Sequence, residues 1–357
     1  MKSPSPQFWS KRRVFLTGHT GFKGSWLSIW LQKMGAEVCG FSLSPSTIPS
    51  LFDDCQVEKG MESLIGDIRD MPALSAAMQS FKPDVVLHLA AQPLVRESYS
   101  DPLGTFSTNI IGTANILEAA RHIGCVRAVV NVTTDKCYEN REWEWAYREN
   151  ERLGGHDPYS SSKACSELIT SSFRSSFFND LGIGLATARA GNVIGGGDWS
   201  VDRLIPDVVR SIVSRKPLTI RNPSATRPWQ HVLEPLSGYL ILAENLFKEG
   251  LPYSEAWNFG PLEQDVKPVS WIADHIISLW GHDQKIIIDR SSNVHEANLL
   301  KLDISKAKAR LNWEPRWDLV TALDKIVDWN KVIVKGGNSR VMCEQQISEF
   351  IESSKAK

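Results

Sequence analysis

Hydrophobic residues in the first half of the chain follow two alternating patterns. Short runs rich in β-branched residues recur, and the longer segments between them repeat apolar residues every three or four positions. The short runs predict strands at residues 13–17, 37–41, 85–89, 127–133 and 184–190, and the longer segments predict helices near residues 24–34, 101–122 and 158–178. Strands that alternate with helices are typical of βαβ units, so we expect an α/β fold with a doubly wound parallel sheet.

The third predicted helix has an apolar stripe and a recognisable start. Asp157 is suited to cap its first turn, and Pro158 to be its first helical residue. The stripe predicts a buried face made by Ala164, Leu168, Ile169, Phe173 and Phe177.

The pattern loosens after Gly191, where three consecutive glycines and then Pro206, Pro217, Pro223 and Pro228 separate short elements. We therefore predict a first domain over residues 1–190, rejoined by about residues 229–260, and a smaller substrate-binding lobe mainly over residues 191–357. The pattern of residues 341–353 predicts a terminal amphipathic helix, which we expect to pack against the domain or to contact another subunit.

Composition and charge narrow the class of protein. Forty Lys and Arg residues balance 41 Asp and Glu residues, which removes the electrostatic argument for a nucleic acid or an anionic membrane as main partner. The six cysteines show neither a CxxC pair nor zinc-ligand spacing, so we expect no metal and a reduced environment. The sequence has no run of about 18 apolar residues and no apolar leader, which predicts a soluble cytoplasmic protein.

A glycine-rich loop follows the first predicted strand directly and leads into the first predicted helix. It reads Gly18-His19-Thr20-Gly21-Phe22-Lys23-Gly24. Glycines at this spacing let the backbone turn tightly and approach a pyrophosphate, whose charge then lies at the N–H groups of the helix N-terminus. The loop therefore predicts a dinucleotide site at residues Gly18, Thr20, Gly21, Phe22, Lys23 and Gly24.

The dinucleotide is predicted to be NAD, bound comparatively weakly. An acidic residue about twenty positions after the loop normally holds the ribose hydroxyls of NAD, but Ser42 lies in this region instead. Residues 38–50 also lack the Lys or Arg that would neutralise the 2′-phosphate of NADP, although Lys23 keeps that alternative open.

Two further segments are expected to reach the cofactor. Asp67 and Ile68 follow a strand-like stretch, where Asp67 either contacts the adenine amino group or caps the helix that starts near Met71. Small residues end the strand at 85–89 and let its backbone lie against the cofactor. The residues concerned are Leu89, Ala90 and Ala91, followed by Gln92 as a substrate contact, whereas His88 is interpreted as a core histidine.

The redox chemistry is predicted to involve Tyr159 and Lys163, which share one helix face at positions i and i+4. A free tyrosine, with a pKa of about 10, is a poor base at neutral pH. A nearby ammonium and a positively charged nicotinamide ring favour the phenolate, and we expect them to lower the pKa of Tyr159 so that it removes a hydroxyl proton.

A second group of polar residues ends the strand at 127–133. Thr133 and Thr134 are followed at once by Asp135 and Lys136. Ligands of an open parallel sheet lie beyond the carboxyl ends of its strands, so these residues are expected to orient a substrate. The alternative is an exposed ion pair on a loop, which would contribute little to stability.

Together these motifs resemble those of the extended short-chain dehydrogenases/reductases, and in particular the nucleotide-sugar 4,6-dehydratases. The likeness runs from the glycine loop through Arg189-Ala190-Gly191-Asn192-Val193 to Leu311-Asn312-Trp313-Glu314-Pro315. Among subclasses, the glycine loop, the Thr133-Thr134-Asp135-Lys136 string and Gly195-Gly196-Gly197-Asp198-Trp199 resemble the CDP-D-glucose 4,6-dehydratases. The resemblance implies a Rossmann-type sheet, NAD as cofactor, deoxysugar synthesis of the lipopolysaccharide O-antigen type, and dimers or tetramers.

The implied reaction oxidises C4 of the sugar with Tyr159 as base, eliminates water across C5 and C6 with Asp135 as acid, and returns hydride to C6. Most such dehydratases carry Glu after the Asp, as the presumed base at C5, but this chain has Lys136. Lys136 either removes the C5 proton, which requires a neutral amine, or stabilises the developing enolate as a cation.

The resemblance also implies a grip on the nucleotide diphosphate in the second lobe. Asn192 and Arg227 match diphosphate contacts, and residues 196–199 and 203–206 resemble the lining of the nucleotide site. The substrate contacts expected there are Asn192, Asp198, Arg203, Leu204, Arg227 and His231, with His295 and its neighbours Glu296 and Asn298 closing over the base.

Two other functions remain open from the sequence. A nucleotide-sugar 4-epimerase would need Tyr159 and Lys163 but not Asp135 beside a proton-handling partner. A non-catalytic dinucleotide sensor would typically lack the tyrosine that is present here. The dehydratase substrate could also be dTDP-glucose or GDP-mannose, because no residue distinguishes the nucleotide base.

Overall fold

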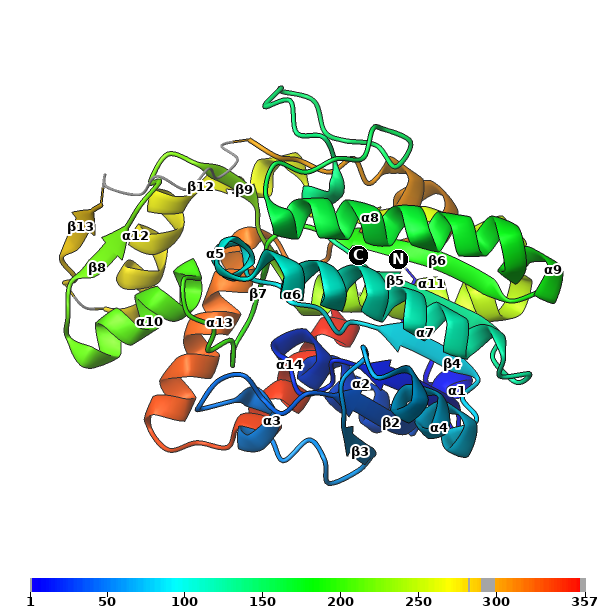
Figure 1. The fold of residues 1–357 in the computed structure, drawn as a ribbon. Coiled ribbons are helices and arrows are strands. Elements are labelled where there is room, and N and C mark those ends of the chain that lie inside the picture. The colour runs from blue at the N-terminus through cyan, green and yellow to red at the C-terminus, as the bar shows by residue number, and fades with distance from the viewer. Residues whose placement is uncertain (1, 282, 290–298, 354–357) are drawn as a thin grey trace.

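The computed structural model describes residues 2–281, 283–289 and 299–353 (Figure 1). At its centre lies a seven-stranded parallel sheet with the strand order β11-β6-β5-β4-β1-β2-β3. The strands are β1 (Arg13–Thr17), β2 (Glu37–Ser42), β3 (Glu62–Ile65), β4 (Val85–His88), β5 (Ala128–Val132), β6 (Gly184–Ala190) and β11 (Ala256–Phe259). The five predicted strands are confirmed to within one residue at each end.

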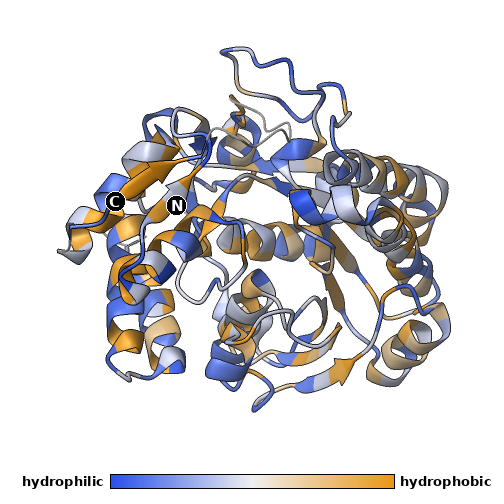
Figure 2. Cartoon of the chain, turned by 60° about the vertical axis from the view of Figure 1, so that its left-hand side comes forward, coloured by the Kyte–Doolittle hydropathy of each residue, from blue (hydrophilic) through white to orange (hydrophobic). Residues whose placement is uncertain are grey.

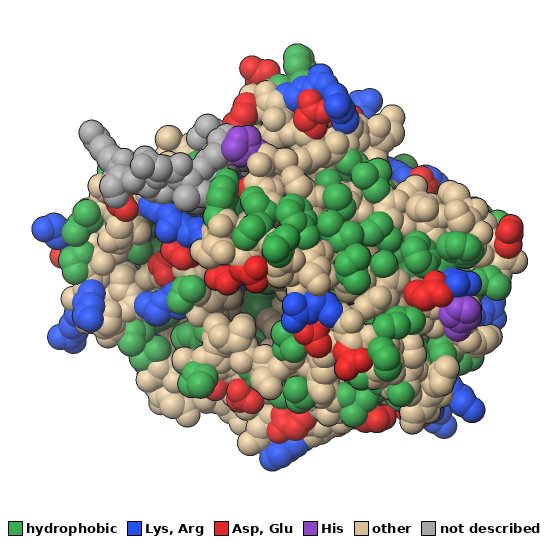
Figure 3. All heavy atoms as spheres, viewed as in Figure 1, with side chains coloured by type: hydrophobic (Ala, Val, Ile, Leu, Met, Phe, Trp, Pro, Cys, Tyr) green, Lys and Arg blue, Asp and Glu red, His purple; other side chains and the backbone are tan. Residues whose placement is uncertain are grey.

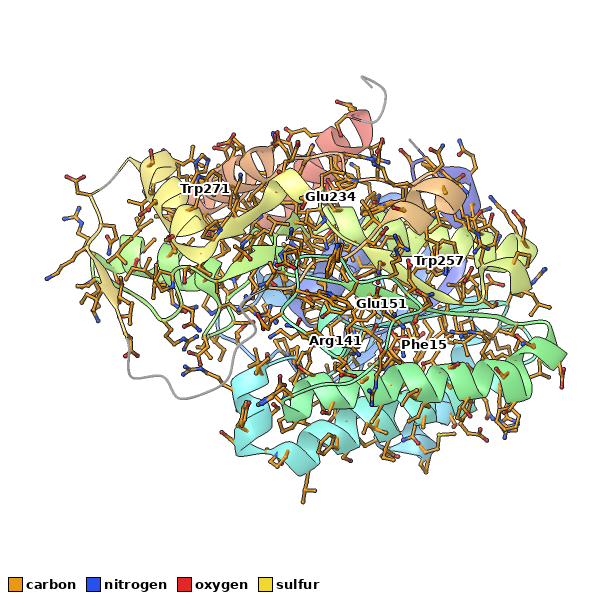
Figure 4. All side chains as sticks on the ribbon, turned by 90° about the horizontal axis from the view of Figure 1, so that it is seen from above. Phe15, Arg141, Glu151, Glu234, Trp257 and Trp271 are labelled. Carbon is orange, nitrogen blue, oxygen red and sulfur yellow. The ribbon has the colours of Figure 1, made fainter. Side chains whose placement is uncertain are left out.

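Each face of the sheet is covered by helices, because consecutive strand residues point to opposite faces. Val14 and Leu16 pack in one apolar cluster, and Phe15 packs in another. The first cluster includes residues of α2 (Phe22–Lys33), α11 (Leu233–Glu249) and α14 (Ser339–Glu352), and the second those of α4 (Met71–Phe81) and α7 (Gly112–Arg121). Figure 4 shows α8 (Pro158–Phe173) on one side of the sheet and Glu234, on α11, on the other.

The start of α8 is as predicted, but its buried face is not. The Asp157 carboxylate accepts the Ser160 N–H at 2.9 Å, and Pro158 is the first helical residue. Leu168 is 58% exposed and Phe177 is 39% exposed, so the predicted apolar stripe faces outward in part. Polar residues are buried there instead, because they find hydrogen-bond partners. Ser166, Glu167 and Thr170 are bonded to residues of the sheet, and Ser162 is bonded to Asn109.

A third apolar cluster joins helices of the smaller lobe. It contains residues of α10 (Leu204–Ser214), α12 (Val269–Trp280) and α13 (Leu319–Val334). Three two-stranded sheets accompany them, made by β7 (Val193–Ile194) with β10 (Gln230–His231), β8 (Leu218–Ile220) with β13 (Ile286–Ile288), and β9 (Thr226–Pro228) with β12 (Val266–Pro268). β11 extends the main sheet and α14 packs on α2, so residues beyond 191 contribute to both parts.

Hydrophobic residues concentrate in the strands of the main sheet, and the helices around it are mixed (Figure 2). The helix predicted at residues 101–122 is divided into α6 (Pro102–Phe106), a π-helical turn η1 (Ser107–Ile111) and α7. A second π-helical turn, η3 (Arg174–Phe178), continues α8. The remaining short elements include α1 (Pro6–Trp9), α3 (Leu51–Asp54), α5 (Val95–Ser100), the 3₁₀ turn η2 (Asp135–Cys137), α9 (Asn179–Leu181) and the 3₁₀ turn η4 (Leu251–Tyr253).

Candidate active site

A cavity of about 1000 Å³ lies beyond the carboxyl ends of β5 and β6, between the main sheet and the smaller lobe. The strand order reverses at β1, which has β2 on one side and β4 on the other, and ligands of such sheets bind near that reversal. The predicted site residues that line the cavity are Phe22, Lys23, Thr134, Asp135, Lys136, Tyr159, Asn192, Asp198, Arg203, Leu204 and Arg227.

The glycine loop has the shape of a phosphate cradle. A β-carbon at position 24 would lie 2.0 Å from the Gly18 carbonyl oxygen, so the loop closes on itself only if this residue is glycine. A β-carbon at Gly21 would meet nothing closer than 3.4 Å, which leaves its outer side open to a ligand. Gly21 starts α2 without a side-chain cap, so N–H groups of the first turn are available to an anion.

Ser42 lies beside the glycine loop, as predicted. Its hydroxyl is 2.9 Å from the Thr20 hydroxyl, which also donates to the Leu43 carbonyl at 2.8 Å. The loop and the end of β2 are therefore joined by neutral hydroxyls. No carboxylate lies at this position, and weak retention of NAD stays a prediction.

In the segment after β3, the prediction that Asp67 caps the next helix is wrong, and its predicted contact with the adenine amino group stays a prediction. Asp70, not Asp67, caps α4, since its carboxylate accepts the Ala73 N–H at 3.1 Å. Asp67 pairs instead with Arg69, whose hydrogen bonds lower the pKa of the carboxyl. The Ile68 side chain is buried in the core, and its carbonyl accepts a hydrogen bond from Asn115 at 2.9 Å.

The end of β4 is hydrogen-bonded to the end of β1, and the predicted cofactor contact of Leu89, Ala90 and Ala91 stays a prediction. His88 is a core histidine, since its Nδ1 is 2.7 Å from the Thr17 hydroxyl and its Nε2 is 3.2 Å from that of Thr113. The Leu89 N–H donates to the Thr17 carbonyl, and the Ala90 N–H to the Thr17 hydroxyl. Ala91 follows, half-buried, in the loop beyond the strand.

Gln92 is not brought to the cavity, and the substrate contact predicted for it is not supported by its position. Its amide nitrogen donates to the Leu94 carbonyl and the Thr105 hydroxyl, and its amide oxygen accepts the Leu94 N–H. The side chain therefore ties the β4 loop to α6.

Tyr159 lies in the first turn of α8, and Lys163 lies one turn further along the same face. The Lys163 ammonium donates to the Val132 carbonyl at 3.0 Å, which anchors it to the end of β5. Burial lowers the pKa of Lys163 to about 8, opposed by Glu167.

The expected lowering of the tyrosine pKa does not occur in the protein alone. Burial raises the pKa of Tyr159 to about 12, because removal from water disfavours the phenolate. A hydrogen bond with Thr134 and the charge of Arg203 oppose the increase, whereas Asp135 adds to it. Any phenolate formed here thus depends on what binds in the cavity.

Asp135 is held as a buried acid. One carboxylate oxygen accepts a hydrogen bond from the Thr134 hydroxyl at 2.9 Å, and the other has no hydrogen-bond partner among the residues that the structure describes. Burial raises the pKa of Asp135, while Lys136 opposes the shift electrostatically. The exposed-loop alternative is excluded, since only 2% of Asp135 is exposed.

The second lobe contributes the cationic side of the cavity. Arg203 pairs with Asp198 at 2.9 Å, and Arg227 is buried and donates to the Thr226 carbonyl at 2.9 Å. The Asn192 carbonyl accepts the Gln230 N–H at 3.0 Å, so its amide side chain is not used by that contact.

His231 does not line the cavity, and its predicted role as a substrate contact is not supported. It is fully buried between Trp26 and Trp317, with ring centroids 6.0 and 4.9 Å away. Its Nδ1 accepts the Leu233 N–H at 3.3 Å. His295, with Glu296 and Asn298, lies outside the described residues.

Three cavity arginines were missed from the sequence: Arg96, Arg210 and Arg221. Arg96 on α5 and Arg221 after β8 both pair with Asp202, at 3.8 and 2.8 Å, so two distant segments meet there. Arg210 follows Arg203 by seven residues, two helical turns, which is a spacing that could have identified it.

The described residues contain no group of three or more His, Cys, Asp or Glu side chains placed to hold a metal ion. Within the same part of the chain, no helix is long and apolar enough to cross a membrane.

In sequence, the chain is similar to known nucleotide-sugar 4,6-dehydratases. The family model described as GDP-mannose 4,6 dehydratase matches residues 15–326. A CDP-glucose 4,6-dehydratase of Salmonella typhimurium (strain LT2) is 53% identical over 97% of this chain and 98% of its own length. A probable dTDP-glucose 4,6-dehydratase of Sinorhizobium fredii is 25% identical, over 89% of this chain and 92% of its own.

Solved structures share the fold. The dTDP-glucose 4,6-dehydratase of Bacillus anthracis in complex with NAD superimposes with a TM-score of 0.76 at 21% identity, covering 90% of this chain and 96% of its own. The epimerase Mth375 of Methanothermobacter thermautotrophicus gives a TM-score of 0.80 at 24% identity, covering 92% and 95%. The fold is thus common to dehydratases and epimerases, and the site must distinguish between them.

Proposed function

The chain belongs to the GDP-mannose 4,6 dehydratase family of the extended short-chain dehydrogenases/reductases, and on this basis we propose that it converts CDP-D-glucose to CDP-4-dehydro-6-deoxy-D-glucose. The observation that carries the proposal is Asp135, a buried carboxyl in the same cavity as Tyr159, with one oxygen that has no hydrogen-bond partner in the described part of the chain. An epimerase requires no such acid. The 53% identity to a CDP-glucose 4,6-dehydratase favours this sugar nucleotide over the dTDP and GDP alternatives.

We assign the cofactor site to the glycine loop and the ends of β2 and β4. The open side of Gly21 and the uncapped start of α2 suit a pyrophosphate, and Ser42 and Thr20 offer hydroxyls to a ribose. NAD held there would supply the acceptor for the C4 hydride and the donor of the same hydride to C6, where C5 regains a proton. Lys163, anchored at Val132, is available to the ribose next to the reacting ring.

Tyr159 is assigned as the base at the C4 hydroxyl. Removal of that proton, while hydride leaves the same carbon, produces a ketone at C4 and makes the C5–H acidic. Burial holds the tyrosine protonated in the protein alone, so the positive charge of the oxidised cofactor and Lys163 must favour the phenolate. Base strength then develops only once the cavity is loaded.

Asp135 is assigned as the acid of the elimination step. Its raised pKa favours the neutral carboxyl, which can give a proton to the departing C6 hydroxyl and release water. Lys136 is assigned as the group that removes the C5 proton, so that a C5–C6 double bond forms. This role requires its amine to be neutral when the substrate binds.

The nucleotide diphosphate is assigned to Asn192, Arg203 and Arg227. Two guanidinium groups and an amide suit two linked phosphates. Leu204 and Asp198 lie in the same wall. The cytosine base of the substrate is inferred from the 53% identity to a CDP-glucose 4,6-dehydratase and not from the chemistry of the cavity side chains.

We further propose that the enzyme is a homodimer that pairs through the helices next to α8. Apolar side chains are exposed there on α6, η1, α8 and η3, and Figure 3 shows them gathered over this face. A contiguous exposed apolar face of this kind is typical of a protein interface. The residues concerned include Leu103, Ile111, Leu168 and Phe177, which are 80, 52, 58 and 39% exposed.

A cytoplasmic location is part of the proposal. It is supported by the six cysteines, all of them unpaired, because disulfides are rare where thiols are kept reduced. The proposed function is tested by incubating the protein with NAD and CDP-D-glucose and identifying the sugar product by NMR.

A further inference from the structure

A buried ion pair lies directly behind the cavity. Glu167 on α8 and Arg189 on β6 are each 3% exposed, and the Arg189 Nη2 is 2.8 Å from the Glu167 Oε2. Burial opposes ionisation of Glu167, but Arg189 and three hydrogen bonds nevertheless hold the pKa of its carboxyl below the ordinary value. A buried pair is costly to desolvate and weak evidence for stability, so its contacts decide what it does.

Glu167, the anion of the pair, contacts Thr133, which lies just before the residues assigned to elimination. The Glu167 Oε1 accepts a hydrogen bond from the Thr133 hydroxyl, and its Oε2 accepts one from Thr187 at 2.7 Å. Thr133 directly follows β5 and directly precedes Thr134 and Asp135. One end of the catalytic turn is therefore attached to Glu167.

Arg189, the cation of the pair, contacts Tyr138 at the other end of this turn. Arg189 Nη1 donates to the Tyr138 hydroxyl at 2.7 Å, and its guanidinium carbon lies 4.8 Å from the centre of the Tyr138 ring. The Tyr138 hydroxyl in turn donates to the Asn258 amide oxygen at 2.7 Å, on β11. Tyr138 directly follows the turn η2, which contains Asp135 and Lys136.

We propose that the Glu167–Arg189 pair is a positioning device for the elimination step, and that Tyr138 is the positioning residue that transmits it to Asp135 and Lys136. The turn between Thr133 and Tyr138 is only four residues long and is attached to one ion pair at both ends. Angular and positional errors of a catalytic group reduce rates steeply, so a turn held in this way keeps acid and base at C6 and C5. This inference rests on the proposed function.

The oxidation machinery is held by other contacts. Tyr159 is positioned by the start of α8, where Asp157 caps the helix, and Lys163 is anchored at the Val132 carbonyl. Tyr159 also has a hydrogen bond with Thr134, at the Thr133 end of the turn. None of these contacts involves Tyr138, which holds the other end. Loss of the Tyr138 hydroxyl is therefore expected to affect elimination and to leave C4 oxidation intact.

The test is Tyr138→Phe, which removes the hydroxyl and keeps the ring over Arg189. Single turnovers of CDP-D-glucose with bound NAD are followed at 340 nm, and wash-in of solvent deuterium at C5 is followed by NMR. We expect C4 oxidation within twofold of the parent rate, C5 exchange and product formation slower by tenfold or more, and a NADH signal that accumulates where the parent shows little.

Tyr147→Phe is the matched control. Tyr147 stacks on Tyr138 with ring centroids 5.1 Å apart, but among the described residues its hydroxyl is hydrogen-bonded only to the Arg141 N–H and the Asn140 amide oxygen. This variant should keep both partial reactions at the parent rate, and melting curves check that both variants are folded. Equal slowing of oxidation and elimination in Tyr138→Phe, or no slowing of either, would overturn the inference. A parent protein that does not turn over would overturn the proposed function, which is established before the variants are compared.

Discussion

Gly191 lies against Asp135, with no room for a side chain between them. A β-carbon at position 191 would be 3.0 Å from the Asp135 Oδ2 and 2.6 Å from the Pro228 ring. The oxygen concerned is the one without a hydrogen-bond partner in the described part of the chain. A side chain at position 191 would therefore displace the Asp135 carboxyl or the Pro228 ring, so glycine at this position preserves the placement of the acid.

Replacing Asp135 by Asn should separate the two halves of the reaction. An amide cannot protonate the leaving C6 hydroxyl, and a general acid contributes about 10²- to 10⁴-fold to such a step. We expect product formation to fall by that factor while C4 oxidation continues, measured as NADH absorbance in a single turnover. Loss of the NADH signal as well would show that Asp135 is needed before elimination.

Replacing Lys136 tests whether it is a base or a cation. Lys136→Ala removes both roles, whereas Lys136→Arg retains the charge and cannot act as a base at neutral pH. If Lys136 takes the C5 proton, both variants should lose deuterium wash-in at C5 by about 10²-fold or more. Exchange retained in the Arg variant would assign electrostatic stabilisation instead, and exchange retained in the Ala variant would exclude any role in proton removal.

Buried histidines should make the fold sensitive to mild acid. Burial lowers the pKa of His231 to about 3, below the ordinary 6.5, so the unfolded chain binds an additional proton between these values. Stability is therefore lost as the pH falls from about 6.5 towards 3, by on the order of 2 kcal/mol at pH 5. His19 and His88, with lowered pKa values of about 4 and about 3, add in the same direction.

Urea unfolding at pH 7 and pH 5 checks this expectation. His231→Phe, packed between the same tryptophans, should lose less stability on acidification than the parent. His122→Gln, an exposed position beside Glu118, is the control and should follow the parent. If His231→Phe and the parent lose the same stability, His231 is not the cause.

The proposed dimer predicts a mutation with an effect on assembly alone. Leu168→Glu places a charge on the exposed apolar face of α8, and a desolvated unpaired charge opposes association. We expect a dimer for the parent and a monomer for this variant in light scattering coupled to gel filtration. Leu251→Glu, at an equally exposed leucine on η4, should remain a dimer. A monomeric parent would rule out the interface.

Five of the seven strands of the sheet could be predicted from the sequence, because buried parallel strands are short apolar runs whatever packs on them. The short edge strands β3 and β11 were not among them. The buried face of α8 could not be predicted in this way. Ser166 and Thr170 are buried because Asn131, on β5, donates to both hydroxyls, a pairing that no local pattern reveals. Leu168 points outward on the opposite side.

The same distinction applies to the site. Tyr159, Asp135 and Lys136 could be predicted, since their motif spacing is tied to strand ends and helix turns. His231 follows Arg227 closely in sequence, yet the chain turns between them and buries its ring in the core. Arg96 and Arg221 meet at Asp202 only through tertiary structure.

The most direct test of the account is turnover of the purified protein with NAD and, separately, CDP-D-glucose, dTDP-D-glucose and GDP-D-mannose. NMR of the products identifies any 4-keto-6-deoxy sugar. The account predicts that CDP-D-glucose is dehydrated with the highest kcat/KM and that its C4 hydrogen appears at C6. Preferred dehydration of another sugar nucleotide, or inversion at C4 without loss of water, would contradict it.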